Sequence, residues 1–221
     1  MYRASFELTG TTPLLMHWDN IDGGDELKAW RQATENKDLS VPGDDRSPPW
    51  TWHKYVYTDG QRVAMPADNI MSALMNGGAQ IIIKKQKTFK ELSQSGILID
   101  QEYCEFHFDG DKQLTAAALA ELYDMSFVLQ AEAVKKLGFR LFAKRAKVGQ
   151  SKHVRIRPRF ETWSVRGELQ VTNAAEVVLT FDVLERIFSF AGKAGLCDWR
   201  PSSPKRPGPY GMFTAVVKKL K

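Results

Sequence analysis

The sequence has 221 residues, of which 43% are hydrophobic and 26% charged, as in an ordinary globular chain with room for one large domain. It contains no run of 18 apolar residues and no apolar signal-peptide core at its start, so we expect no membrane span and a cytoplasmic location. Its two cysteines lie far apart and its four histidines are scattered, so we expect reduced thiols, no metal site and no cofactor.

The N-terminal third predicts a strand followed by a long insertion. Tyr2–Leu8 places alternate apolar residues on one face, as a half-buried strand does. The insertion, around residues 19–57, holds a short helix at Asp25–Thr34 and an exposed loop rich in Pro, Gly and Asp at Leu39–Pro49. Alternating aromatics in Trp50–Tyr57 predict one arm of a hairpin, because an Asp-Gly turn signal follows them.

A helix opens the middle of the chain. Asp68 fits the N-cap of this helix, which carries Ile70 and Leu74 on one side and ends at Gly77-Gly78. The elements that follow are a helical restart at Ile81–Lys87, a loop at Thr88–Ser95, strands at Ile97–Ile99 and Tyr103–Phe108, and a helix or Ala-rich connector at Thr115–Tyr123.

Strand patterns dominate the next segment. The elements are strands at Ser126–Glu132 and Phe139–Ala143, a strand region at Val154–Val171, a helix at Thr180–Ala191 and a final strand at Met212–Leu220. The apolar residues of the strand region change parity near Glu161-Thr162. Because strict alternation cannot switch faces without an extra residue, we expect a bulge or bend there.

Without its insertions, the order of elements is β-α-β-β-α-β. This is the split βαβ or ferredoxin-like arrangement. We therefore expect an α+β fold with a ferredoxin-like (RRM-like) core. We expect a single domain over residues 1–221, with insertions around 19–57 and 84–150.

Basic residues are concentrated in the second half of the chain. Ala133–Phe160 holds ten basic residues and no acidic one, whereas the first 60 residues hold ten acidic and six basic residues. The net charge of +5 therefore hides a strong asymmetry. A basic tract without interspersed acids favours a polyanionic partner over a merely solvated surface.

Three arginines in this tract have the spacing of one strand face. Arg155, Arg157 and Arg159 alternate with other residues, and neighbours at i and i+2 on a strand lie about 6.6 Å apart. Like charges so placed repel one another, whereas Arg binds phosphate or stacks on bases. We predict that the three contact nucleic acid, with electrostatic support from Lys144, Arg145, Lys147 and Lys152. The alternative is a solvated edge strand that blocks aggregation.

The last 35 residues carry a second nucleic-acid prediction. A glycine-rich basic loop separates the last helix from the last strand, and glycines free the backbone to present N–H groups to oxygens. Its cations would hold a phosphate backbone, and its aromatic faces would stack bases. The predicted contacts are Lys193, Trp199, Arg200, Lys205 and Arg206. The alternative is a plain connecting loop.

Catalytic residues are only weakly indicated. His17 and His53 are the histidines near candidate loops, where a metal-independent ribonuclease would need a general base and a cation beside the phosphate. Asp22 and Asp25 offer oxygen ligands for a divalent ion. Each reading lacks a second anchored partner in the sequence, so we predict no catalytic site.

Three segments together resemble the RAMP superfamily, which supplies the RNA-binding backbone subunits and the repeat-RNA endonucleases of CRISPR systems. Gly10–His17 is similar to the G-x-x-P-L opening of that family, and Val63–Leu74 is similar to its entry into the first helix. Gly192–Phe213 is similar to its C-terminal glycine-rich loop and final strand.

The tail is also similar to that of solitary relatives in phage and prophage genomes, through Asp198–Pro201 and Tyr210–Phe213. Ala67, Cys197 and Met212 depart from the family pattern. The resemblance implies a ferredoxin-like core whose inserted loops grip single-stranded RNA, with the insertion after residue 19 as a clasp. It also implies self-association along nucleic acid or with other CRISPR-like subunits. The family's endonucleases place a histidine near the first helix, which leaves His17 and His53 as the enzymatic candidates.

We therefore predict a non-catalytic protein that binds single-stranded nucleic acid, RNA preferred, similar to a CRISPR backbone subunit and of phage type. One alternative is a metal-independent endoribonuclease of the same superfamily. Another is a phage structural or scaffold protein whose basic tract meets an acidic protein partner.

Overall fold

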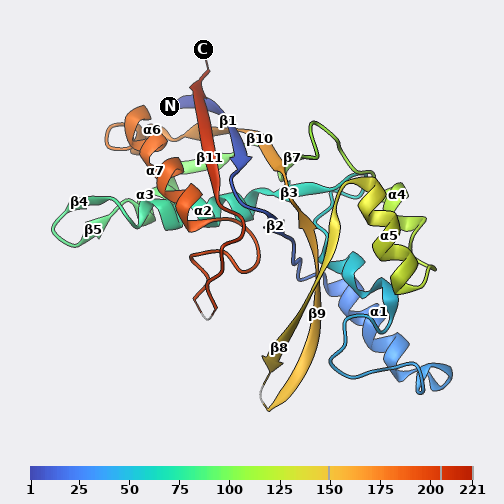
Figure 1. The fold of residues 1–221 in the computed structure, drawn as a ribbon. Coiled ribbons are helices and arrows are strands. Elements are labelled where there is room, and N and C mark those ends of the chain that lie inside the picture. Colours follow the sequence, from blue (N-terminus) through green and yellow to red (C-terminus); the bar gives the residue numbers. More distant parts are fainter. Residues whose placement is uncertain (149, 205, 221) are drawn as a thin grey trace. The chain divides into compact units, whose positions relative to one another are not determined.

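The computed structural model describes all residues except 149, 205 and 221, and its chain divides into two compact units (Figure 1). Unit 1 comprises Met1–Leu14, Ala64–Lys112 and Glu161–Lys221, and unit 2 comprises Leu15–Val63 and Gln113–Phe160. The insertion expected at 19–57 falls within unit 2, whereas the one expected at 84–150 is divided between the units. Helices occur alongside antiparallel sheets, which confirms the α+β class.

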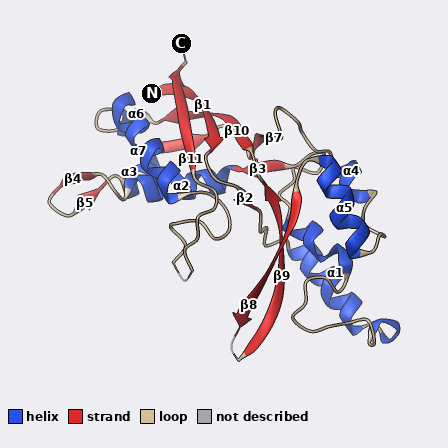
Figure 2. Ribbon diagram, in the orientation of Figure 1, coloured by secondary structure: helices blue, strands red, loops and turns tan. Residues whose placement is uncertain are grey.

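Unit 1 is built on one antiparallel sheet. Its strands are β1 (Tyr2–Gly10), β3 (Ala64–Pro66), β4 (Ile82–Lys84), β5 (Lys87–Thr88), β6 (Ile97–Ile99), β7 (Tyr103–Phe108), β10 (Trp163–Val171) and β11 (Phe213–Lys219). Its helices are α2 (Ala67–Gly78), α3 (Lys90–Gly96), α6 (Asn173–Glu176) and α7 (Phe181–Ala194). The sheet has the order β11-β1-β10-β7-β3, with β6 also paired to β10, while β4 and β5 form a separate hairpin (Figure 2).

Alternation along β1 determines which side of this sheet is covered. Ala4, Phe6 and Leu8 are buried, as the sequence predicts, and the Phe6 ring centroid lies 5.6 Å from that of Phe188 on α7. Helix α7 also packs closely on α2. A Cβ at Gly77 of α2 would lie only 2.3 Å from a carbonyl oxygen of α7, so the absence of a side chain there permits the approach. The opposite face of the sheet carries the polar residues of the same strands.

Unit 2 combines short helices with a three-stranded sheet. Its elements are β2 (Leu14–Leu15, at the sequence boundary of the units), α1 (Ile21–Gln32), the 3₁₀ helices η1 (Thr34–Asn36) and η2 (Pro49–Tyr55), α4 (Ala116–Ala120), α5 (Phe127–Leu137), β8 (Arg140–Val148) and β9 (Ser151–Phe160). The sheet order is β2-β9-β8. Aromatic side chains fill the core: Phe139 stacks on Phe160, with centroids 5.1 Å apart, and packs against Trp52 at 5.9 Å.

The predicted strand at Ser126–Glu132 is wrong, because this segment begins helix α5. Ser126 caps that helix, its hydroxyl accepting from the N–H of Leu129, and Gly138 ends it in the left-handed conformation with φ of 103°. Both are ordinary helix boundary signals. The apolar residues between them had suggested a strand only because the run is short and lacks clear periodicity.

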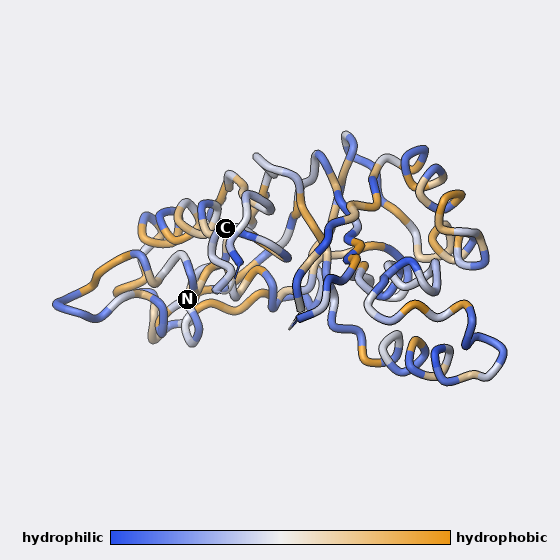
Figure 3. Tube along the Cα trace, turned by 60° about the horizontal axis from the view of Figure 1, so that its bottom comes forward, coloured by the Kyte–Doolittle hydropathy of each residue, from blue (hydrophilic) through white to orange (hydrophobic). Residues whose placement is uncertain are grey.

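Three further local predictions are wrong. Ile81–Lys87 forms the β4–β5 hairpin instead of a helix, and its apolar strand and hydrophilic tip are visible at the left of Figure 3. Thr88–Ser95 contains most of helix α3, and Trp50–Tyr57 is largely the 3₁₀ helix η2. The bend expected near Glu161-Thr162 is confirmed, because these two residues form a bend between the end of β9 and the start of β10. Among the described residues, no helix is both long and apolar enough to cross a bilayer.

Candidate nucleic-acid interface

Strands β8 and β9 form a long hairpin, residues 140–160, which we call the basic arm (Figure 1). Its register places three pairs of cations directly opposite each other: Arg140 and Arg159, Lys144 and Arg155, and Lys147 and Lys152. Directly opposed side chains share a face of the hairpin, and like charges in that position are destabilising. No residue between 133 and 160 is acidic, so the arm itself provides no carboxylate to offset this repulsion.

One buried carboxylate reaches the arm from the loop before η2. Asp45 is only 1% exposed, and two backbone hydrogen bonds attach its loop to Val154 of β9. Its Oδ1 accepts from Arg155 Nη1 at 2.9 Å. Its Oδ2 accepts from the backbone N–H of Ile156 at 3.1 Å and faces Arg157 Nη1 at 3.5 Å. The exposed loop expected at Leu39–Pro49 thus contains a buried carboxylate, Asp45, that no pattern in the sequence indicates.

The predicted role of Arg157 is corrected by this arrangement. Its side chain is 7% exposed, and its guanidinium carbon lies 4.6 Å from the centroid of the Tyr55 ring. The Tyr55 hydroxyl is 3.3 Å from Asp45, and burial raises the pKa of Tyr55 to about 12. A guanidinium in this position stabilises the junction of the arm with η2 and does not present itself to a phosphate in solvent. Arg155 shares the same carboxylate but stays 28% exposed.

The outer part of the arm holds its accessible cations. Arg159, near the base, is half-buried, with its guanidinium carbon 5.4 Å from the centroid of Phe142. The four residues predicted as electrostatic support are all exposed: Lys144, Arg145, Lys147 and Lys152. The supporting cations therefore face solvent, whereas the predicted central contacts are partly or wholly covered.

In unit 1, the glycine-rich loop between α7 and β11 is a folded element. The N–H of Gly211 donates to the carbonyl of Pro13 at 2.8 Å, and the N–H of Leu196 donates to the carbonyl of Gly211 at 2.9 Å. Gly211 has φ of +72°, and a Cβ there would lie 2.0 Å from the Leu196 carbonyl oxygen. Only glycine fits a backbone approach this close in the left-handed region.

The loop also contacts the opening segment of the chain and the entry of α2. The N–H of Thr11 donates to the Met212 carbonyl at 2.8 Å, which connects the opening segment to the tail. The Cys197 Sγ lies 3.8 Å from the Met65 Sδ, which connects the tail to the entry of α2. Segments far apart in the sequence are thus neighbours within unit 1.

The cations of this loop differ in accessibility. Arg200 is half-buried and bonds within the loop, to the Cys197 carbonyl at 2.6 Å and to Ser202 Oγ at 3.0 Å, so it closes the loop instead of facing a ligand. Lys193 and Arg206 are exposed, and Lys205 lies outside the described residues. Trp199 and Tyr210 are half-buried, with ring centroids 6.4 Å apart.

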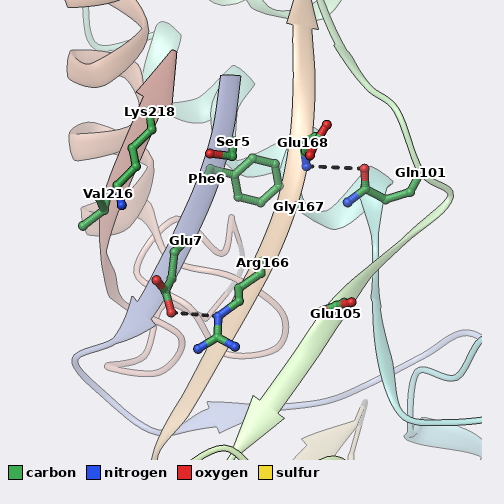
Figure 4. Close-up of a pocket in the computed structure, with 10 residues that line it drawn as sticks. All are labelled: Ser5, Phe6, Glu7, Gln101, Glu105, Arg166, Gly167, Glu168, Val216 and Lys218. Carbon is green, nitrogen blue, oxygen red and sulfur yellow. Dashed lines mark hydrogen bonds and ion pairs between the residues drawn. The ribbon is translucent and has the colours of Figure 1, made fainter. Parts of the chain in front are cut away.

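The open face of the unit 1 sheet contains a shallow hollow of about 440 Å³ (Figure 4). Its arginine is paired: Arg166 donates to Glu7 at 2.9 Å and to Asp111 at 3.1 Å. Of the ten residues that line it, the single aromatic is Phe6, which is 3% exposed. The lining of the hollow therefore offers no accessible ring on which a base could stack.

The two candidate histidines lie in unit 2 in different surroundings. His53 is held against Trp52, with ring centroids 3.9 Å apart, and burial lowers its pKa to about 4. A histidine with so low a pKa is a weak base, and its side chain is half-buried. His17 is exposed, with its ring 4.8 Å from that of Tyr55. Within the described part of the chain, no group of three or more His, Cys, Asp or Glu could hold a metal ion.

The sequence matches no protein-family model and no curated protein.

Proposed function

We propose that this protein binds single-stranded nucleic acid, RNA preferred, without cleaving it, and that the exposed cations of the basic arm are its main contact. The observation that carries the proposal is the acid-free arm with three opposed pairs of cations, in one of which Asp45 offsets the charge of Arg155. Such a pattern raises the free energy of the unliganded arm, and a polyanion relieves that repulsion while releasing its condensed counterions.

The buried carboxylate explains how the arm keeps its conformation without a ligand. Asp45 offsets the charges of Arg155 and Arg157, which lie in the middle of β9. The ion pairs with Asp45 thereby fix the covered part of the arm in place. The exposed part of the arm carries basic side chains. A preorganised binding surface loses less conformational entropy on association.

We also propose that unit 1 is a ferredoxin-like core of the RAMP type. Its main elements follow one another as β1, α2, β7, β10, α7 and β11, and these strands lie in the order β11-β1-β10-β7. Each β-α-β connection therefore skips one strand, as in a split βαβ unit. The contacts among the opening segment, the entry to α2 and the tail add support. Self-association along nucleic acid, or with CRISPR-like subunits, belongs to this part of the proposal.

The test measures binding of a labelled 20-nucleotide RNA and its DNA counterpart by fluorescence anisotropy at several salt concentrations. The arm variant replaces four exposed cations with glutamine: Lys144→Gln, Arg145→Gln, Lys147→Gln and Lys152→Gln. A control variant removes the same charge at scattered exposed positions: Lys28→Gln, Lys37→Gln, Lys218→Gln and Lys219→Gln.

The plot of log K against log salt has a negative slope, and each lost phosphate contact on a single strand reduces the magnitude of this slope by about 0.7. The loss of four contacts therefore reduces it by about 3. We expect this change in the arm variant and only a small one in the control. Undetectable binding by the wild type at low ionic strength would refute the proposal. Equal losses of affinity in the arm variant and the control variant would also refute it, because the loss would then follow the net charge of the protein and not the position of the cations.

A further inference from the structure

A second acid-free basic segment lies outside the basic arm, in unit 1. Between Asn69 and Lys90 the sequence has four lysines and no acidic residue. Three of these lysines gather on the β4–β5 hairpin, which extends from between α2 and α3 (Figure 1). We call residues 81–89 the lysine hairpin.

The tip of the lysine hairpin concentrates positive charge. Lys84 lies directly opposite Lys87, and Lys85 sits in the turn between them with φ of +53°. All three side chains are exposed, and none forms an ion pair with a carboxylate of the described residues. The tip therefore repeats, on a smaller scale, the opposed cations of the basic arm.

The base of the lysine hairpin is anchored in unit 1. Ile81 and Phe89 are 3% and 6% exposed, and the N–H of Phe89 donates to the Ile81 carbonyl at 3.1 Å. A Cβ on Gly78, just before the hairpin, would lie 2.4 Å from Ser93 Oγ of α3. The close packing of α2 and α3 thus holds the ends of the hairpin, and its tip extends from a fixed base.

Two apolar side chains flank the charged tip. Ile82 is 69% exposed and Ile83 is 40% exposed, and successive residues of a strand point to opposite faces. Figure 3 shows this order, with an apolar stretch before the hydrophilic tip. Fully burying an isoleucine side chain gives about 1.5–3 kcal/mol, so covering Ile82 on binding would contribute favourably.

We infer that the lysine hairpin is a second contact for single-stranded nucleic acid, its lysines binding phosphates and Ile82 packing on an unstacked base or sugar. This inference rests on the proposed function. Nucleic acid is favoured because its phosphates complement the tip and its base faces complement the apolar strand. A lipid bilayer is disfavoured, because the charged tip would have to enter the hydrocarbon before the isoleucines.

The test uses two variants of the full chain, with thermal unfolding to verify their fold. The tip variant is Lys84→Gln, Lys85→Gln and Lys87→Gln, and its control is Lys28→Gln, Lys37→Gln and Lys218→Gln. We expect the tip variant alone to lower the salt slope by about 2, so that its affinity loss between 50 and 200 mM salt is about 20-fold smaller than that of the wild type. The other variant, Ile82→Ser, is expected to keep the salt slope of the wild type. It should reduce the rise in fluorescence that a 2-aminopurine base in the strand shows when binding unstacks it.

The outcomes separate this inference from the proposed function. If the wild type binds RNA and only the basic-arm variant weakens it, the lysine hairpin is not a contact and the proposed function stands. An unchanged salt slope in the tip variant, together with stable binding of the hairpin to an acidic protein, would assign the site to a protein partner and refute the inference. If the wild type binds no nucleic acid, both proposals fail.

Discussion

Asp45→Asn should strongly destabilise unit 2 and detach the basic arm from η2. The replacement removes the charge from a carboxylate whose side chain is 2% exposed and which lies 2.9 Å from Arg155 and 3.5 Å from Arg157. Arg157, at 7% exposure, would then be a buried cation without this counter-charge. Removing one partner of a buried pair destabilises a protein by about 3–5 kcal/mol.

This loss is large enough to measure by calorimetry or by far-UV circular dichroism. In a protein of this size, 1 kcal/mol corresponds to roughly 2–4 °C in Tm, so we expect the transition that includes unit 2 to fall by roughly 6–20 °C. The matched control is Asp44→Asn at the adjacent residue. Asp44 pairs with Arg46, whose side chain is 51% exposed, and an exposed pair contributes about 0–1 kcal/mol.

A double variant tests the physical reason for the effect. Adding Arg157→Met to Asp45→Asn removes the buried cation as well, and replacing both charges with uncharged groups is often close to neutral. We therefore expect the double variant to be more stable than Asp45→Asn alone. If Asp45→Asn lowers Tm no more than Asp44→Asn, or if Arg157→Met adds to the loss, the account of the arm's attachment is refuted.

Two other predictions concern pH and the glycine-rich loop. Burial lowers the pKa of His53 to about 4 from an unfolded value near 6.5, so the unfolded state binds the extra proton first as pH falls. The contribution of neutral His53 to the free energy of unfolding should be complete above pH 6.5 and should fall by about 3 kcal/mol toward pH 4. His53→Leu should remove this part of the pH dependence of Tm. Gly211→Ala should lower Tm, because its Cβ would lie 2.0 Å from the Leu196 carbonyl oxygen at φ of +72°, whereas Gly24→Ala, with open space around it, should leave Tm unchanged or higher. Equal Tm values for these two alanine variants, or the same pH slope in His53→Leu as in wild type, would contradict the corresponding prediction.

The sequence by itself determined the elements that have strong local signals. The alternation in β1, the amphipathic pattern of α7 and the final strand β11 all lie where the sequence predicts them, because burial of one face imposes a period on the residues. The absence of acids from 133–160 is likewise visible without any structure. Helix α5 shows how such reasoning fails, since its capping residues were present but the short apolar run suggested a strand.

Only the tertiary structure decided which cations are exposed. Arg155 and Arg157 have the same strand spacing as solvent-facing residues, yet a carboxylate more than 100 positions earlier binds both. No periodicity connects Asp45 to β9, because that contact depends on how a loop without regular structure returns to the sheet. The lysine hairpin was hidden for a similar reason: its isoleucines resemble core residues in sequence, and only the packing of α2 on α3 leaves them outside. Exposure is a property of the folded surface, so a linear pattern can suggest charge but cannot say which charges remain uncovered.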